Sequence, residues 1–173
     1  MTDITNLPSD ITPEDFFMEV LPELLGEVDL PDGLGTERLQ FHFTGDDGMD
    51  IHIGVDDDGD LTLEEGQSDS PPIAISASTS DFRAAIAGSL RDQVKAETGD
   101  IAIGPKQLRK AFMPDSKVQR IKALSGDLQF RLKDSRLGDE YAYTLTLGGK
   151  APNASSPTTT VSLDLPTLLE IVS

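Results

Sequence analysis

The chain has 173 residues, a formal net charge of −17 and a pI of about 4.2, with 37% apolar residues. This length suits one ordinary domain, and the composition is that of a soluble globular protein. The negative charge disfavours binding to nucleic-acid phosphates, the absence of cysteine excludes disulfides, and no apolar run is long enough to span a bilayer. We therefore expect a soluble, cytoplasmic protein that is not transmembrane and binds no nucleic acid.

The first predicted element is a helix from Thr12 to Gly26, after an irregular lead-in over residues 1–11. Thr12 is a good N-cap residue, and Pro13 suits the first helical position. Apolar doublets recur four residues apart and form one wide stripe along the helix. Pro22 should kink this helix or divide it into two short ones.

Four strands are predicted next. Segment 39–55 alternates apolar and polar residues on both sides of a short connection, which predicts a hairpin with Phe41 opposite Ile51. A third strand is expected at 61–66 and a fourth at 71–78, because Leu61 and Ile73 each begin a run with the same alternation.

Helical patterns follow the fourth strand, and strand patterns then resume. The expected helices cover 79–88, with Thr79 or Ser80 as the cap, 89–97, 105–113 and 116–124; strands follow at 126–134, 141–149 and 157–165, with a last helix at 166–173. The sequence LQFHF at residue 39 recurs as LQFRL at residue 128, and each copy leads to a proline, a short strand and a helix. Two related halves and a chance similarity of short hairpins both remain open.

The acidic stretch Ile51–Gly66 has the composition of a calcium loop. An EF-hand loop requires an oxygen ligand at its first position, where this chain has Gly54, and helices on both sides, where the pattern predicts strands. Asp57, Asp58 and Gly59 are also typical of a tight connection between strands. We interpret the stretch as a solvated turn.

The two histidines are predicted to lie on the outward face of the hairpin, with Asp50 opposite His42. A group of His42, Asp50 and His52 could hold a transition metal weakly, but two solvated histidines on an exposed sheet face are the simpler interpretation. No further histidine or cysteine completes a catalytic metal site, and no nucleophile or phosphate-loop motif is present. We therefore expect no enzymatic activity, no catalytic or metal-binding residues and no cofactor.

Basic residues concentrate between Lys106 and Lys122, a segment with a net charge of +5. Two short amphipathic helices in this segment could make transient contact with an anionic membrane or dock on an acidic partner. The alternative is that these cations are solvated and lie beside the protein's own carboxylates.

The order of parts from Thr12 to Leu132 resembles the sterol carrier protein type two family of small lipid-binding domains. The resemblance rests on the front helix PEDFFMEVLPELL, the hairpin LQFHFTGDDGMDIHIGV, the stretch LTLEEGQSDSPPIAISASTSDFRAAIAG and the later strand SGDLQFRL. It implies an α+β fold, with a mostly antiparallel twisted sheet of about five to seven strands and helices packed on one face. We predict a single domain of this kind over residues 12–173, and the chain departs from the family by a C-terminal extension from about residue 134.

The resemblance further implies non-enzymatic binding, and with it transfer, of a lipid such as a sterol or a fatty acyl chain in a tunnel between sheet and helices. The matching apolar positions, which are expected to line the tunnel, are Phe16, Phe17, Leu21, Leu24, Phe41, Ile51, Phe82, Ile86, Leu90, Val94, Leu108 and Phe112. Pocket linings and closed cores use the same residue types. An acidic protein-interaction module with a closed core and no ligand is therefore the alternative.

Overall fold

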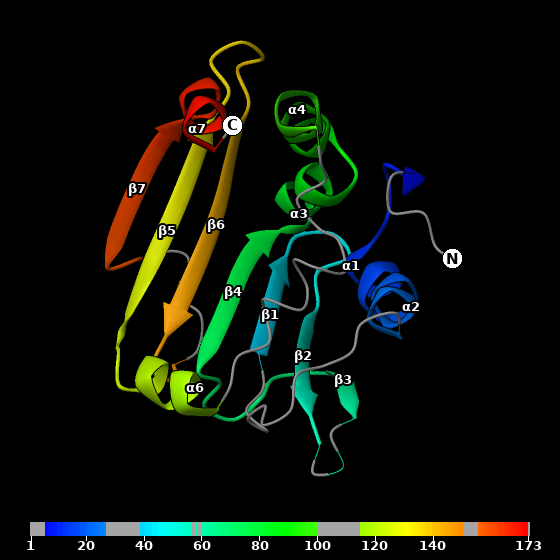
Figure 1. Cartoon of the computed structure of the whole chain (residues 1–173), viewed down its shortest axis with the longest axis vertical. Helices are drawn as coiled ribbons and strands as arrows, with labels where there is room; N and C mark the ends of the chain where they lie inside the picture. Colours follow the sequence, from blue (N-terminus) through cyan, green and yellow to red (C-terminus); the bar gives the residue numbers. More distant parts are fainter. Residues whose placement is uncertain are drawn as a thin grey trace.

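A computed structural model describes residues 6–26, 39–56, 58, 60–99, 115–150 and 156–172 of the chain. Within these residues, seven strands form one open sheet in the order β3-β2-β1-β4-β6-β5-β7 (Figure 1). The strands are β1 (Leu39–Thr44), β2 (Asp50–Val55), β3 (Leu61–Glu65), β4 (Ile73–Ser78), β5 (Gly126–Lys133), β6 (Glu140–Leu147) and β7 (Thr159–Asp164). The helices are α1 (Pro13–Asp15), the π-helical segment η2 (Phe16–Val20), α2 (Leu21–Gly26), α3 (Thr79–Ile86), α4 (Ser89–Thr98), α6 (Asp115–Lys122) and α7 (Leu165–Val172). The fold belongs to the expected α+β class.

The sheet is mixed, so the prediction of a mostly antiparallel sheet is wrong. From β3 to β7, successive neighbours pair antiparallel, antiparallel, parallel, antiparallel, antiparallel and parallel. The parallel pairs are β1 with β4 and β5 with β7, and each of them requires a crossover of the chain. Alternation of apolar and polar residues predicts a strand but does not specify the direction of its neighbour, which is why the sequence did not predict these pairs.

The order of pairings occurs twice, once in each half of the sheet. Leu39 pairs with Ile73 in the first parallel ladder, and Leu128 pairs with Thr159 in the second, so both ladders start at the same position of the repeated LQF sequence. Each of the strands β4 and β7 leads directly into a helix, α3 and α7 respectively. The similarity between the halves noted in the sequence therefore extends to the topology and register of the sheet.

Residues Pro13–Gly26 form helical turns without a break, and their middle part is π-helical. At the start, the Asp15 N–H donates to Thr12 Oγ1 at 3.0 Å and the Thr12 N–H donates to Asp15 Oδ2 at 3.2 Å, which confirms Thr12 as the N-cap. The Leu21 N–H reaches back to the Phe16 carbonyl, five residues earlier, just before Pro22. This wider turn accommodates the proline, which has no N–H, so the helix is not divided at Pro22.

The other expected elements are present in the described residues, with one difference at a cap. The N-cap of α3 is Ser78, whose Oγ accepts a hydrogen bond from the Asp81 N–H at 3.0 Å, and not Thr79 or Ser80. The predicted helix at 105–113 lies outside the described residues. No helix in the described ranges combines the length and apolar character needed to cross a membrane.

The helices and the sheet enclose two apolar clusters on one face of the sheet. The first joins Phe16 and Phe17 of the front helix with strands β1, β2 and β4 and with Phe82 of α3. The second joins Leu90 of α4 with Tyr141 of β6 and the start of α7. This face, with the helices over it, contains the candidate site.

Candidate functional site

Rows of apolar residues cross the helix-side face of the sheet in register. In one row, Phe41 pairs with both Ile51 and Ile75, Ile75 pairs with Leu145, and Leu145 pairs with Leu128. Residues paired in this way place their side chains on the same face of a sheet. The row is therefore an unbroken apolar line from β2 to β5.

Aromatic rings fill the β1–β2 end of this face. The ring centroid of Phe17 lies 4.9 Å from that of Phe41 and 5.6 Å from that of Phe43, and the rings of Phe43 and Phe82 are 4.9 Å apart. Phe16 contacts Phe17 and Phe82 at 5.3 and 5.6 Å. These spacings are those of rings in direct contact. Side chains therefore occupy the space between the front helix and β1.

The same face is less covered where it crosses β4, β6 and β5. Ile51, at the β2 end of the row, is 0% exposed, whereas Ile75, Leu145 and Leu128 are half-buried. Phe41 between them is also half-buried, but it packs against the first cluster. Phe130, two residues beyond Leu128 on β5 and on the same face, is also half-buried. These neighbouring apolar side chains retain accessible surface that a bound apolar molecule would cover.

The second apolar cluster bounds this half-buried region toward α4 and α7. Leu90, Tyr141 and Leu165 are buried there, and the residues that pack against them from α3 include Ala84 and Ala85. Because alanine side chains are small, α3 contributes less side-chain volume here than the phenylalanines contribute at the other end.

Two tyrosine hydroxyls lie at this boundary. The Tyr143 hydroxyl donates to the Asp81 carbonyl at 2.8 Å, and the hydroxyls of Tyr141 and Ser89 are 2.8 Å apart. Burial raises the pKa of Tyr143, and the negative charge of Asp81 raises it further. Burial also raises the pKa of Tyr141, against the opposing effect of its hydrogen bond with Ser89. Both hydroxyls are therefore neutral hydrogen-bonding groups at pH 7.

The predicted tunnel residues are distributed over several environments. The residues within or against the first cluster are Phe16, Phe17, Leu21, Phe41, Ile51, Phe82 and Ile86. Leu24 is buried at 5% exposure, and Leu90 and Val94 belong to the second cluster or pack against it. Leu108 and Phe112 lie outside the described residues. The prediction thus combined residues of two separate clusters in one lining.

The half-buried residues of β4, β5 and β6 were not among the predicted site residues. Leu145 falls in the predicted C-terminal extension, beyond residues 12–132. The strict alternation around Ile75, Leu128 and Leu145 was the signal that could have placed them on the inner face. Only the order of the strands shows that they adjoin one another.

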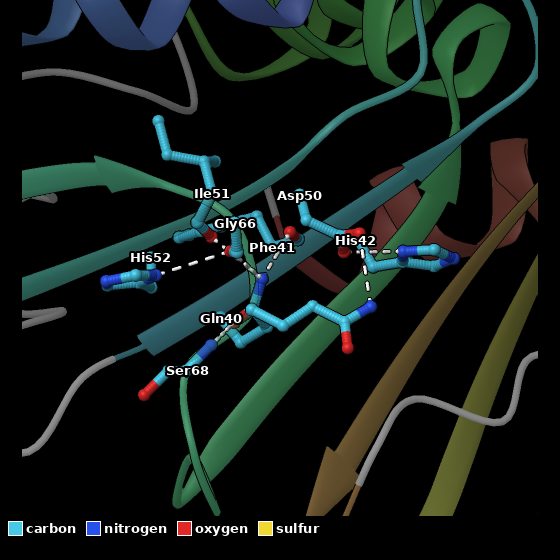
Figure 2. A network of polar contacts seen from close by, with 9 residues as sticks. Gln40, Phe41, His42, Asp50, Ile51, His52, Gly66 and Ser68 are labelled. Carbon is cyan, nitrogen blue, oxygen red and sulfur yellow. Dashed lines mark hydrogen bonds and ion pairs between the residues drawn. The ribbon is translucent and has the colours of Figure 1, made fainter.

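The opposite face of the sheet is polar and holds the loop that follows β3 (Figure 2). Gln40 Nε2 donates to the carbonyl oxygens of Phe41, Ile51 and Gly66 at 3.0, 3.2 and 3.2 Å, and Gln40 Oε1 accepts from the Ser68 N–H at 2.7 Å. Gln40 is 2% exposed, so these bonds satisfy an amide that water cannot reach. The network fixes the start of the crossover from β3 to β4.

The two histidines belong to the same network, and the prediction that both are solvated is wrong for His52. His42 Nδ1 lies 2.7 Å from Asp50 Oδ1, in the expected cross-strand position. His52 is only 6% exposed, and its two ring nitrogens each lie 3.3 Å from an oxygen, those of the Gly66 carbonyl and the Glu64 carboxylate. In the described residues, no group of three or more metal-ligating side chains is placed to hold an ion.

The acidic stretch contains the turn that the sequence predicts. Asp56 Oδ1 accepts hydrogen bonds from the N–H groups of Asp58 and Asp60 at 3.0 and 2.8 Å, and the flanking strands β2 and β3 pair antiparallel. Asp57 and Gly59 lie outside the described residues. The Asp56 carboxylate thus stabilises the turn by accepting hydrogen bonds from its backbone N–H groups.

An open hollow of about 410 Å³ lies where β5, β6 and β7 approach the β5–β6 turn. Its lining residues are Lys133, Asp134, Ser135, Gly138, Asp139, Glu140, Ser162, Leu163 and Asp164. The Asp134 carboxylate accepts from Gln93 Nε2 at 2.8 Å and from the N–H groups of Arg136 and Leu137 at 2.9 and 3.2 Å. The bond from Gln93 lowers the pKa of Asp134, and the two backbone bonds act in the same direction. The Asp134 carboxylate therefore stabilises the β5–β6 turn.

Part of the basic segment is described, as helix α6 beside the ends of β5 and β6 that lie away from α7 (Figure 1). Lys117 and Arg120 are exposed, Val118 is buried, and Leu124 just beyond the helix is 53% exposed. Cations and an accessible apolar side chain therefore lie close together in the sequence at this end of the sheet. Residues 106–114 lie outside the described residues.

Comparisons with models of protein families, with curated protein sequences and with solved structures found no match to this chain.

Proposed function

We propose that the protein binds one apolar molecule, such as a sterol or a fatty acyl chain, on the helix-side face of its sheet and catalyses no reaction. The observation that carries this proposal is the half-buried apolar row of Ile75, Leu145 and Leu128 beside the filled β1–β2 end. Covering such side chains contributes roughly 25 cal/mol per Å² of apolar surface removed from water. Burial alone can therefore hold a ligand here.

The likeness to the sterol carrier protein type two family supports the same function. A front helix, an antiparallel hairpin, a third strand, a crossover strand and a helix follow one another from Thr12 to Ile86 in the order that carries the resemblance. The proposed site differs from the first prediction in its place. It lies over β4, β6 and β5, because the phenylalanines occupy the space over β1.

We also propose that the protein acts in the cytoplasm and transfers its ligand by transient contact with anionic membranes. Lys117 and Arg120 of α6 would approach the lipid head groups, and the exposed Leu124 would enter the interface. A surface with an overall charge of −17 would otherwise be repelled by such membranes.

A closed interaction module is the second candidate, and the phenylalanine cluster favours it. Five rings in mutual contact leave the β1–β2 end of the layer filled without any ligand. In that case the acidic surface would bind a positively charged partner, and the binding would weaken as salt increases.

Native mass spectrometry of freshly purified protein, followed by solvent extraction, tests the first function. A stoichiometric lipid, or saturable uptake of a fluorescent fatty acid, is the expected result. Leu145→Gln should weaken this uptake about tenfold, since the loss of buried apolar contact is worth about 1.4 kcal/mol. The matched control is Leu63→Gln, a half-buried leucine on the same face in the edge strand β3, which should bind normally.

A protein that stays bare after incubation with fatty acids and sterols would overturn the proposal and favour the closed module. Equal binding by the wild type and by folded Leu145→Gln would reject this location for the site.

A further inference from the structure

Strand β7 is the last strand of the sheet, whereas its equivalent in the first half, β4, is followed by a further strand. Strands β6, β5 and β7 repeat the pairings of β2, β1 and β4, first antiparallel and then parallel. At the end of the first half, β4 pairs on its outer side with β6 in antiparallel orientation. β7 holds the equivalent place in the second half, with the same parallel register on its inner side. Within the described residues, no strand pairs with its outer edge.

The sequence of β7 has few of the features that commonly protect an edge strand. Thr159–Asp164 reads TTVSLD and contains no lysine, arginine or proline. Thr159, Thr160 and Ser162 are exposed, and Val161 and Leu163 are half-buried on the helix side. Natural edge strands usually carry a charge, a proline or a bulge that prevents pairing with another chain. The only charged residue of β7 is Asp164 at its end, and Thr159, Thr160 and Val161 are β-branched, a composition that favours the addition of a strand along most of this edge.

We propose that β7 pairs antiparallel with β7 of a second copy of this chain, which joins the two sheets across a twofold axis. The first half shows the orientation of such a pair, because β4, the equivalent of β7, has its outer edge covered by an antiparallel strand. A second copy supplies such a strand by symmetry, and a twofold axis perpendicular to the sheet makes the pairing antiparallel.

The faces of the sheet restrict the register of this pair. Residues opposite one another in an antiparallel pair share a face, so the axis must pass through a residue and not between two residues. Centring on Val161 places the two valines opposite each other and Thr160 of each copy opposite Ser162 of the other. Asp164 then lies opposite Thr158, so the carboxylates of the two copies do not face each other.

Introducing charges at the exposed residues Thr160 and Ser162 tests the proposal, with the association measured by analytical ultracentrifugation. Thr160→Lys with Ser162→Lys gives a lysine variant, and Thr160→Glu with Ser162→Glu gives a glutamate variant. Each should be monomeric, because like charges would lie directly opposite one another in the dimer. An equimolar mixture of the two should form the heterodimer. Both positions are exposed, so the variants should fold, and circular dichroism checks this.

The wild type should associate as its concentration rises toward about 1 mM, and more strongly at high salt, which screens the repulsion between acidic copies. Thr62→Lys on the other edge strand, β3, is the control and should leave the association unchanged. A wild type that stays monomeric throughout this range, a dimer that survives in both charge variants, or a mixture that does not associate would overturn the proposal.

Discussion

The two regions of the helix-side sheet face have the same sequence pattern but different packing. Over β1 and β2, rings of the front helix and of α3 cover the sheet, and Ile51 and Phe43 are 0% and 6% exposed. Over β4, β6 and β5, residues of the same apolar character such as Ile75 and Leu145 are half-buried. Alternation of apolar residues therefore identifies the inner face of a strand, but it does not show how completely the side chains of the helices bury that face. The difference separates a structural core from a candidate binding surface.

The largest expected effect is in the filled region. Phe82→Ala removes a ring that is 5% exposed and contacts Phe16, Phe17 and Phe43, so the free energy of unfolding should fall by about 3–5 kcal/mol. Urea denaturation measures the loss. The control is Met18→Ala in the front helix, next to Phe17 in the sequence, a residue that is 46% exposed, which should cost less than about 0.5 kcal/mol. A small loss for Phe82→Ala would show that this end of the layer is not tightly packed.

A smaller but substantial effect is expected at the end of β6, where backbone contacts support the half-buried region. Gly148 has φ of +87°, and a Cβ there would lie 2.0 Å from the Leu124 carbonyl oxygen. Gly148→Ala should therefore cost more than the roughly 1–2 kcal/mol of an unfavourable backbone angle alone. Gly138 also has a positive φ, +80°, but open space around it, so Gly138→Ala should cost only that backbone term. Equal melting temperatures for the two variants would contradict this contact.

Replacement of a half-buried residue should cost less than replacement of a buried ring. Leu145→Ala should lower the free energy of unfolding by about 1–2 kcal/mol, below the range for fully buried leucines, because part of the side chain is already accessible. The same urea experiment with Phe82→Ala alongside compares the two regions directly. If Leu145→Ala were as destabilising as Phe82→Ala, the two regions would be equally packed and the candidate site would lose its basis.

The smallest effect concerns Tyr143, which packs against both clusters. Its folded-state pKa is raised by burial, so the folded protein binds more protons than the unfolded chain above the ordinary tyrosine value of about 10. The stabilising contribution is complete below pH 10 and is lost as the pH rises above it, by at most about 1.4 kcal/mol per pH unit. Denaturation at a series of pH values should show a shallower decline for Tyr143→Phe. An unchanged slope would mean that the hydroxyl is accessible to water in the folded state.

The amino-acid sequence by itself determined most of the local structure. The Thr12 cap, the hairpin pairing of Phe41 with Ile51, the acidic turn and the strands at the end of the chain all follow from residue chemistry and short-range periodicity. These features involve neighbours within one or two elements, so their physical causes can be recognised in short segments. The repeated LQF sequence left open whether the chain has two related halves.

Only the tertiary structure decided which elements lie side by side and what covers them. The parallel pairs, the burial of His52 beneath the crossover loop and the proximity of Ile75 to Leu145 depend on contacts between segments far apart in the sequence. A strand has the same sequence pattern whether its neighbour is parallel or antiparallel. An inward-facing leucine likewise fits the same pattern whether its side chain is fully buried or partly accessible. The packing of the whole chain distinguishes these cases, because burial is a property of the surroundings of a residue and not of the residue itself.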